Sequence, residues 1–215
     1  FGVADEKVHV THLGKSQNFY PREKLAVSEV INKYQLSLGQ YVIAVGTLEP
    51  RKNLVQAIDT YKLLPEKVAQ QFPLVIIGMR GWKEKALISD LEVLVKQGKA
   101  KMLGYVPSED LPYLYSGARS LIFPSLYEGF GLPVLEAMAC GCPIVASSSS
   151  SIPEVVGDAG VLVDVGDAES MKTSIETLCE DDDEYKTTNG ISFSCLFSFS
   201  LFGVLILFFK RLMGW

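Results

Sequence analysis

The sequence predicts an α/β fold, in which a parallel sheet carries helices on both of its faces. Short apolar runs, rich in Val, Ile and Leu, alternate along the chain with longer amphipathic segments. Alternation of this kind is typical of parallel strands that are joined by right-handed helical crossovers. The net charge of −5 at pH 7 argues against a nucleic-acid-binding protein, which normally carries a basic face.

The apolar runs have the length of buried strands, and the segments between them have the spacing of helices. We expect strands at residues 41–45, 74–77, 100–103, 120–123, 144–146 and 161–163. We expect helices at residues 54–64, 83–97, 109–115, 134–139 and 168–179. Asn53 and Ser108 are of the residue types that cap the first turn of a helix, so we expect them at the starts of two of these helices.

Composition divides the chain into three parts. Residues 1–20 precede the domain, residues 21–184 form the globular domain, and residues 185–215 form a hydrophobic tail. Within the tail, residues 191–209 carry no charge and are long enough to cross a bilayer as a helix. Two interpretations remain open: the tail is a membrane anchor, or it is an out-of-frame ending. We expect a cytoplasmic protein, associated with the membrane if the anchor is real.

Residues 127–136 hold two carboxylates, Glu128 and Glu136, on either side of a glycine-rich turn. Pro133 suits the first position of a helix, because its fixed φ and missing N–H cost nothing there. Gly129 and Gly131 let the backbone turn tightly and approach a ligand. The N–H groups at a helix start attract anions, so this turn predicts a cradle for a diphosphate.

The segment resembles the Glu-x7-Glu signature of the retaining glycosyltransferases of family 4, also called glycosyl transferases group 1. The resemblance extends to residues 45–53, 137–146 and 152–160, which match further blocks of that family in the same order. It implies the C-terminal, nucleotide-sugar-binding half of a GT-B fold, which is a Rossmann-like domain. It also implies that residues 1–20 are an interdomain crossover segment.

The resemblance also implies roles for individual residues. Lys52 matches the phosphate-binding lysine, and Thr47 replaces the arginine that usually follows the first glycine, so Arg51 takes that role in our interpretation. Glu128 is assigned to the sugar or the phosphate next to it, and Glu136 to the ribose hydroxyls. We therefore class Glu128, Arg51 and Lys52 as catalytic residues.

The backbone completes the expected donor site. The N–H groups of Phe130, Gly131 and Leu132 would bind the diphosphate, and the backbone near Val106 would meet the nucleobase. The expected donor site also includes Gly46, Thr47 and Gly78, which lie at the ends of expected strands. Gly78 would let the donor approach closely.

The expected reaction is transfer of a hexose from a GDP- or UDP-sugar to a glycan or lipid-linked sugar, with retention of anomeric configuration. We expect no cofactor and no metal, because no cluster of His and Asp residues is evident. The acceptor-binding N-terminal domain of the family is missing from this sequence. The alternative is a non-catalytic nucleotide-sugar-binding module, or a truncated fragment that needs a separate acceptor domain. We read the serines at residues 147–151 as a flexible surface loop.

Overall fold

A computed structural model describes residues 13–79, 85–182 and 185 of the 215-residue chain. Its strands are β1 (Val42–Val45), β2 (Leu74–Ile77), β3 (Ala100–Gly104), β4 (Ser120–Phe123), β5 (Ile144–Ser147) and β6 (Val161–Val163). Its helices are α1 (Lys24–Asn32), α2 (Leu54–Leu63), α3 (Glu66–Gln71), α4 (Lys85–Lys96), α5 (Leu111–Ser116), α6 (Leu132–Ala139), α7 (Ile152–Val156) and α8 (Ala168–Glu180), with a short 3-10 helix, η2 (Pro50–Lys52).

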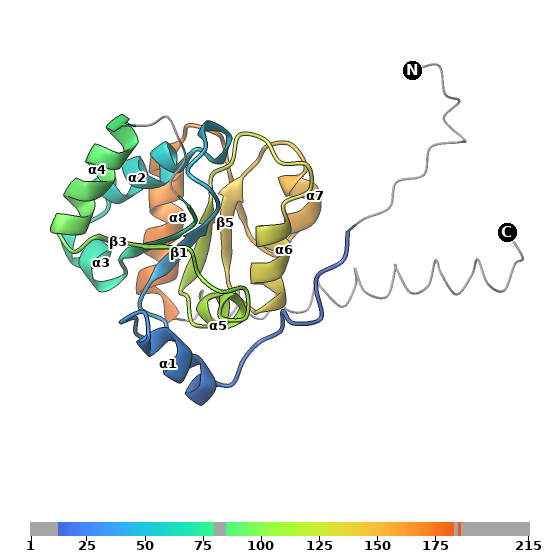
Figure 1. Ribbon diagram of the computed structural model, residues 1–215. Coiled ribbons are helices and arrows are strands. Elements are labelled where there is room, and N and C mark those ends of the chain that lie inside the picture. The colour runs from blue at the N-terminus through green and yellow to red at the C-terminus, as the bar shows by residue number, and fades with distance from the viewer. Residues whose placement is uncertain (1–12, 80–84, 183–184, 186–215) are drawn as a thin grey trace, which may run out of the picture.

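The six strands form one parallel sheet in the order β3-β2-β1-β4-β5-β6 (Figure 1). The strand order reverses between β1 and β4, which are neighbours at the centre of the sheet. Ligands of such sheets bind beyond the carboxyl ends of the strands, at the point of reversal. The predicted Rossmann-like α/β class is confirmed, and the topology marks the loops after β1 and β4 as the place for a site.

Both faces of the sheet are covered by helices, because alternate strand residues point to opposite sides. Ile43 and Leu121 face a core that includes α1, α5, α6 and α7. Val42 and Ile122 face a second core that includes α2, α3, α4 and α8. Burial on both sides explains why the strand sequences are continuous apolar runs.

The strand predictions agree with the structure to within one residue at each end. Three helices were not predicted, α1, α3 and α7, and each is short or buries few side chains. Helix α1 buries only Val27 and Ile31, and α3 and α7 span one to two turns. Helices α3 and α7 are too short to show a clear helical hydrophobic period, and α1 buries too few side chains to show one.

One expectation about helix starts was confirmed in position, and two were wrong. Pro133 is the second residue of α6 and not the first, because that helix begins at Leu132. Ser108 does not cap a helix, because α5 begins at Leu111 and Asp110 takes the N-cap position. Asp110 is fixed there by tertiary contacts, since its carboxylate accepts a hydrogen bond from Tyr34 at 2.7 Å. Asn53 does occupy the N-cap position of α2, but its side chain makes no capping hydrogen bond and binds Gln56 and Pro124 instead.

The predicted crossover and tail fall largely outside the described residues. Residues 1–12 and 186–215 are not described, so the membrane interpretation of residues 191–209 stays a prediction. In the described part of the chain, no helix is both long enough and apolar enough to cross a membrane.

Candidate functional site

The candidate site lies at the carboxyl edge of the sheet, where the loops after β1, β4 and β5 meet. The β1 loop leads through η2 to α2, and the β4 loop leads to α6. Parallel pairing of β1 with β4 brings both loops to the same end of adjacent strands. Residues separated by more than seventy positions in the sequence are therefore neighbours here.

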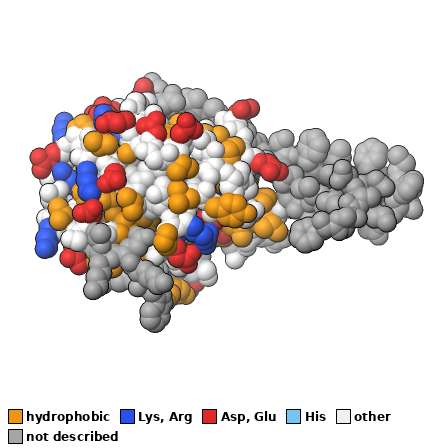
Figure 2. Space-filling view, turned by 90° about the horizontal axis from the view of Figure 1, so that it is seen from above, with side chains coloured by type: hydrophobic (Ala, Val, Ile, Leu, Met, Phe, Trp, Pro, Cys, Tyr) orange, Lys and Arg blue, Asp and Glu red, His pale blue; other side chains and the backbone are white. Residues whose placement is uncertain are grey.

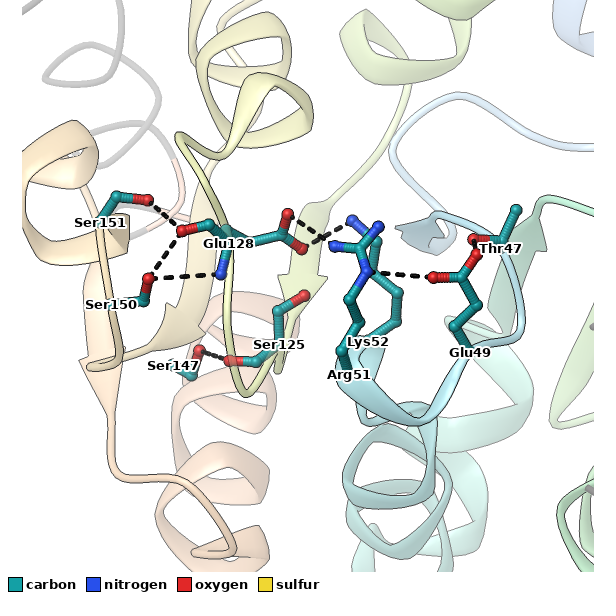
Figure 3. Close-up of polar contacts among 9 residues, drawn as sticks. All are labelled: Thr47, Glu49, Arg51, Lys52, Ser125, Glu128, Ser147, Ser150 and Ser151. Atoms are coloured by element: carbon teal, nitrogen blue, oxygen red, sulfur yellow. Dashed lines mark hydrogen bonds and ion pairs between the residues drawn. The ribbon is translucent and has the colours of Figure 1, made fainter.

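A buried ion pair connects these two loops. Lys52 Nζ donates to Glu128 Oε1 at 2.6 Å, and both side chains are buried, with 10% and 8% of their surfaces exposed. Arg51 Nη1 binds the other carboxylate oxygen, Glu128 Oε2, at 3.2 Å. Figure 3 shows the Glu128 carboxylate facing both cations across the gap between the loops. The structure thus brings together all three residues that the sequence predicted to be catalytic.

Arg51 is held on its other side by Glu49, which the sequence analysis did not single out. Arg51 Nε donates to Glu49 Oε2 at 3.0 Å, and about half of the Arg51 side chain is exposed. Thr47 Oγ1 donates to Glu49 Oε1 at 2.8 Å, and this hydrogen bond lowers the pKa of the Glu49 carboxyl, with help from Arg51. Two cations and two carboxylates therefore form one chain of contacts with no net charge (Figure 3).

Gly46 and Gly78 are required by packing inside the protein, whatever a donor does nearby. A Cβ on Gly46 would lie 3.3 Å from two carbons of the Lys52 side chain. A Cβ on Gly78 would lie 1.9 Å from the Gly46 carbonyl oxygen, which is far closer than van der Waals contact. Gly46 thus leaves room for the buried lysine, and Gly78 lets the end of β2 pass close to the end of β1.

The β4 loop ends at the start of α6, where the sequence predicted an anion cradle. Gly131 occupies the N-cap position with φ 97° and ψ 42°, a left-handed conformation that favours glycine. Among the described residues, no side chain caps this helix start. Phe130 packs against the core, and Leu132, the first helical residue, is 42% exposed. A Cβ on Gly129 would meet nothing within 4 Å, so open space adjoins the turn.

Glu136 lies one turn inside α6 and is partly buried. Burial raises the pKa of its carboxyl to about 7, and the neighbouring Tyr115 hydroxyl opposes part of this shift. The Tyr115 hydroxyl is itself buried and has no hydrogen-bond partner of good geometry in the described part of the chain. Because this pKa lies near neutral pH, a ligand that contacts the Glu136 carboxyl can change its state of ionisation.

The same edge exposes several large apolar side chains. Met79, Tyr105 and Tyr127 follow β2, β3 and β4, and each is more than 60% exposed. Figure 2 views the molecule from above and shows apolar side chains across the middle of this surface, with acidic and basic groups around them. Val106 differs, because its side chain is buried in the core and only its backbone is available near this edge.

The serines at residues 147–151 run from the end of β5 into the loop before α7, and Ser148 and Ser150 are exposed, as expected of a surface loop. The expected flexibility of this segment stays a prediction. All five hydroxyls donate hydrogen bonds, four of them to backbone carbonyl groups of residues 125–128. The run of serines directly after a strand was the signal in the sequence. The groups that these serines bind belong to the loop after β4, and no local sequence pattern identifies that neighbour.

Other groups that could form a site do not converge at this edge. Among residues 13–79, 85–182 and 185, no group of three or more His, Cys, Asp or Glu side chains could hold a metal ion. A cavity of 530 Å³ lies at the opposite edge, lined in part by Arg119. Arg119 binds the carbonyl groups of Leu178 and Cys179 at the end of α8, and forms an ion pair with Asp182. Its charge therefore stabilises a helix end.

Comparison with known proteins agrees with this geometry. The family model described as "Glycosyl transferases group 1" matches residues 29–189. The chain is 42% identical over 200 residues to O-antigen chain mannosyltransferase B of Escherichia coli, covering 92% of this chain and 52% of that protein. The chain thus spans about half the length of this curated relative.

Solved structures share the fold. A structure of Anabaena Alr3699/HepE in complex with UDP and glucose superimposes with a TM-score of 0.78 at 23% identity, covering 91% of this chain and 53% of that one. The C-terminal domain of a glycosyl transferase group 1 family protein (LpcC) from Francisella tularensis superimposes with a TM-score of 0.73 at 23% identity. The overlap covers 86% of this chain and 96% of that domain.

Proposed function

This chain belongs to the glycosyl transferases group 1 family, and on that premise we propose that it is the donor-binding part of a glycosyltransferase. The observation that carries the proposal is the ion pair between Lys52 and Glu128, which joins the loops on either side of the strand reversal. The site lies beside the start of α6, where a diphosphate would be favoured. An acceptor-binding domain, supplied by the rest of the protein, would complete the enzyme.

In this proposal the donor diphosphate binds between η2 and the start of α6. Transfer breaks the bond between the anomeric carbon and a phosphate oxygen, so negative charge grows on the leaving phosphate. The N–H groups of Phe130, Gly131 and Leu132 would stabilise that charge together with Lys52 and Arg51. A lysine ammonium has three N–H donors, so Lys52 can hold Glu128 and a phosphate oxygen at once.

The two glutamates would recognise the two ends of the donor. Glu136 would accept hydrogen bonds from the ribose hydroxyls, for which a carboxylate has enough lone pairs. Glu128, already oriented by two cations, would accept from a sugar hydroxyl near the diphosphate. The backbone at Val106 would contact the nucleobase, because its own side chain is occupied in the core.

We propose mannose as the sugar, because the curated relative named above is a mannosyltransferase and is 42% identical. The nucleotide would be GDP or UDP, and the acceptor a glycan or a lipid-linked sugar. We further propose retention of configuration, with the donor phosphate helping to take the acceptor proton. NMR of the product formed by the complete enzyme tests retention: a product of inverted configuration would contradict it.

Isothermal titration of the chain with GDP-mannose, UDP-glucose and ADP-glucose tests the donor site. Saturable binding of at least one is expected, and Glu136→Ala should abolish most of it. Glu29→Ala is the matched control, because Glu29 is an exposed glutamate on α1, a helix that supplies no residue to the candidate site. Failure of every nucleotide-sugar to bind would overturn the proposal.

A transfer assay separates an enzyme part from a non-catalytic binding module. With the acceptor-binding half of the protein added, an enzyme part should transfer sugar from the bound donor. A module without catalytic function would bind the donor and transfer none under the same conditions.

A further inference from the structure

The serine loop, residues 147–151 from the end of β5 to the start of α7, is joined by hydrogen bonds to the loop that carries Glu128. Ser147 Oγ donates to the Ser125 carbonyl and Ser149 Oγ to the Leu126 carbonyl, both at 2.5 Å. The Glu128 carbonyl accepts two hydrogen bonds, from Ser150 Oγ at 2.7 Å and from Ser151 Oγ at 3.0 Å. Figure 3 shows the Ser150 and Ser151 hydroxyls on the side of Glu128 opposite to Lys52 and Arg51.

We infer that Ser150 and Ser151 are positioning residues, which hold the Glu128 backbone so that its carboxylate meets Lys52 and the donor. The inference deepens the proposed function and, for its effect on binding, rests on it. Glu128 is held at both ends: its carboxylate binds the β1 loop, and its carbonyl binds the β5 loop. The serines would therefore limit how far this carboxylate can move.

Both serines adopt arrangements that local preferences disfavour. Ser150 has φ 57°, a left-handed conformation uncommon for residues other than glycine. Ser151 occupies the N-cap position of α7, where a serine side chain usually binds a backbone N–H of the first turn. Here it makes no capping hydrogen bond, and its hydroxyl donates to Glu128. Sites with such departures from local preference are often functional.

The remaining serine supplies a control inside the same loop. Ser148 Oγ donates to Asp164 Oδ1 at 2.6 Å. Within the described residues its hydroxyl makes no hydrogen bond to the β4 loop, so Ser148→Ala removes a hydroxyl without affecting Glu128 directly. Ser150→Gly removes the hydroxyl while keeping a residue that tolerates positive φ. Ser151→Ala removes the second hydroxyl, and Ser151→Thr retains one. The test compares S150G/S151A with S148A, and S151T with S151A.

Hydrogen exchange of the full 215-residue chain tests the positioning without any ligand. Amides of residues 126–130 should exchange about tenfold faster in S150G/S151A than in the wild type. The double change removes three hydrogen bonds to the Glu128 backbone: the two to its carbonyl, and one that its N–H donates to Ser150 Oγ at 3.4 Å. S148A should leave their exchange within about twofold of the wild type. Equal exchange in S150G/S151A and the wild type would overturn the inference.

Titration with GDP-mannose and UDP-glucose then tests the link to Glu128. For the donor that the wild type binds, S150G/S151A should raise Kd about 5- to 10-fold, and S150G/S151T should recover part of the loss. In a Glu128→Gln background the same serine changes should alter Kd less than about twofold, because their effect acts through that carboxylate. An undiminished effect in that background would refute the positioning role.

The two proposals fail separately. If the wild type binds no nucleotide-sugar, the proposed function is wrong, and the exchange measurement still decides whether the serines hold the Glu128 loop. If the donor binds normally to S150G/S151A and the exchange of residues 126–130 is unchanged, the donor site stands and the positioning role is refuted.

Discussion

Replacing Glu128 by glutamine removes the negative charge that faces two cations at the centre of the site. The amide has nearly the shape of the carboxylate, so the change tests charge with little effect on packing. Lys52 loses the negative charge that lies 2.6 Å from its ammonium, while its side chain stays 90% buried. Arg51 keeps its ion pair with Glu49. The result should therefore report mainly on the buried lysine.

The structure allows the size of the effect to be worked out. Removing one partner of a buried ion pair costs about 3–5 kcal/mol, because the remaining charge is left in a poorly solvated place. The glutamine oxygen can still accept a hydrogen bond from Lys52, so we expect the lower end, about 3 kcal/mol. For a domain of this size, that corresponds to a decrease in Tm of about 6–12 °C.

Urea denaturation measures the loss, with Glu49→Gln as the matched control. Glu49 binds the same arginine, but its side chain is 45% exposed, so solvent screens this pair and its loss should destabilise the protein far less than the loss of the buried pair. The slope of the free energy of unfolding against urea should be unchanged in both variants. If E128Q and E49Q lower the free energy of unfolding equally, the burial of the Lys52 pair does not contribute as argued.

The same geometry supports four further predictions. Arg51→Ala should change stability by less than about 1 kcal/mol, since Arg51 is half exposed, yet weaken donor binding measurably by titration; a large loss of Tm would contradict this. Donor affinity should rise about tenfold between pH 6 and pH 8 and reach a plateau above pH 8, because ribose hydroxyls favour the ionised form of Glu136, whose pKa is about 7. Glu136→Gln should remove this pH dependence. A wild-type affinity that does not change with pH would refute the assignment. The raised pKa has the opposite sign for folding: its contribution to stability is fully present below pH 4.5 and is lost as the pH rises through 7, which urea titrations at several pH values would detect. Gly78→Ala should cost about 3 kcal/mol or more, because its Cβ would overlap the Gly46 carbonyl, whereas Gly129→Ala, with open space around it, should be near wild type by thermal denaturation.

Much of the fold was predictable because burial on both faces of a parallel sheet leaves a clear pattern. The run at residues 74–77 is Leu-Val-Ile-Ile, and the structure pairs all four residues with β1 and β3. The position of Glu128 before a glycine-rich turn and a helix was also evident from the sequence. These features depend on residue type and spacing over a few positions.

The ends of helices were less predictable, because tertiary contacts decide between nearby candidates. Ser108 has the right chemistry for a cap, yet Asp110 takes that position because Tyr34, on the segment after α1, binds its carboxylate. Asn53 stands at a helix start, but its side chain amide binds Gln56 and Pro124. A local preference of about 1 kcal/mol is easily overridden by contacts of similar strength.

By itself, the sequence determined that this protein has a parallel α/β sheet and a loop suited to a diphosphate. Only the tertiary structure decided that Glu128 pairs with both Lys52 and Arg51, that Gly78 makes room for the Gly46 backbone, and that the serine loop holds Glu128. Each of these contacts joins the ends of different strands, which lie next to one another because the sheet is parallel and reverses its order between β1 and β4. The partners are far apart in the sequence, so no local pattern specifies which of them will meet.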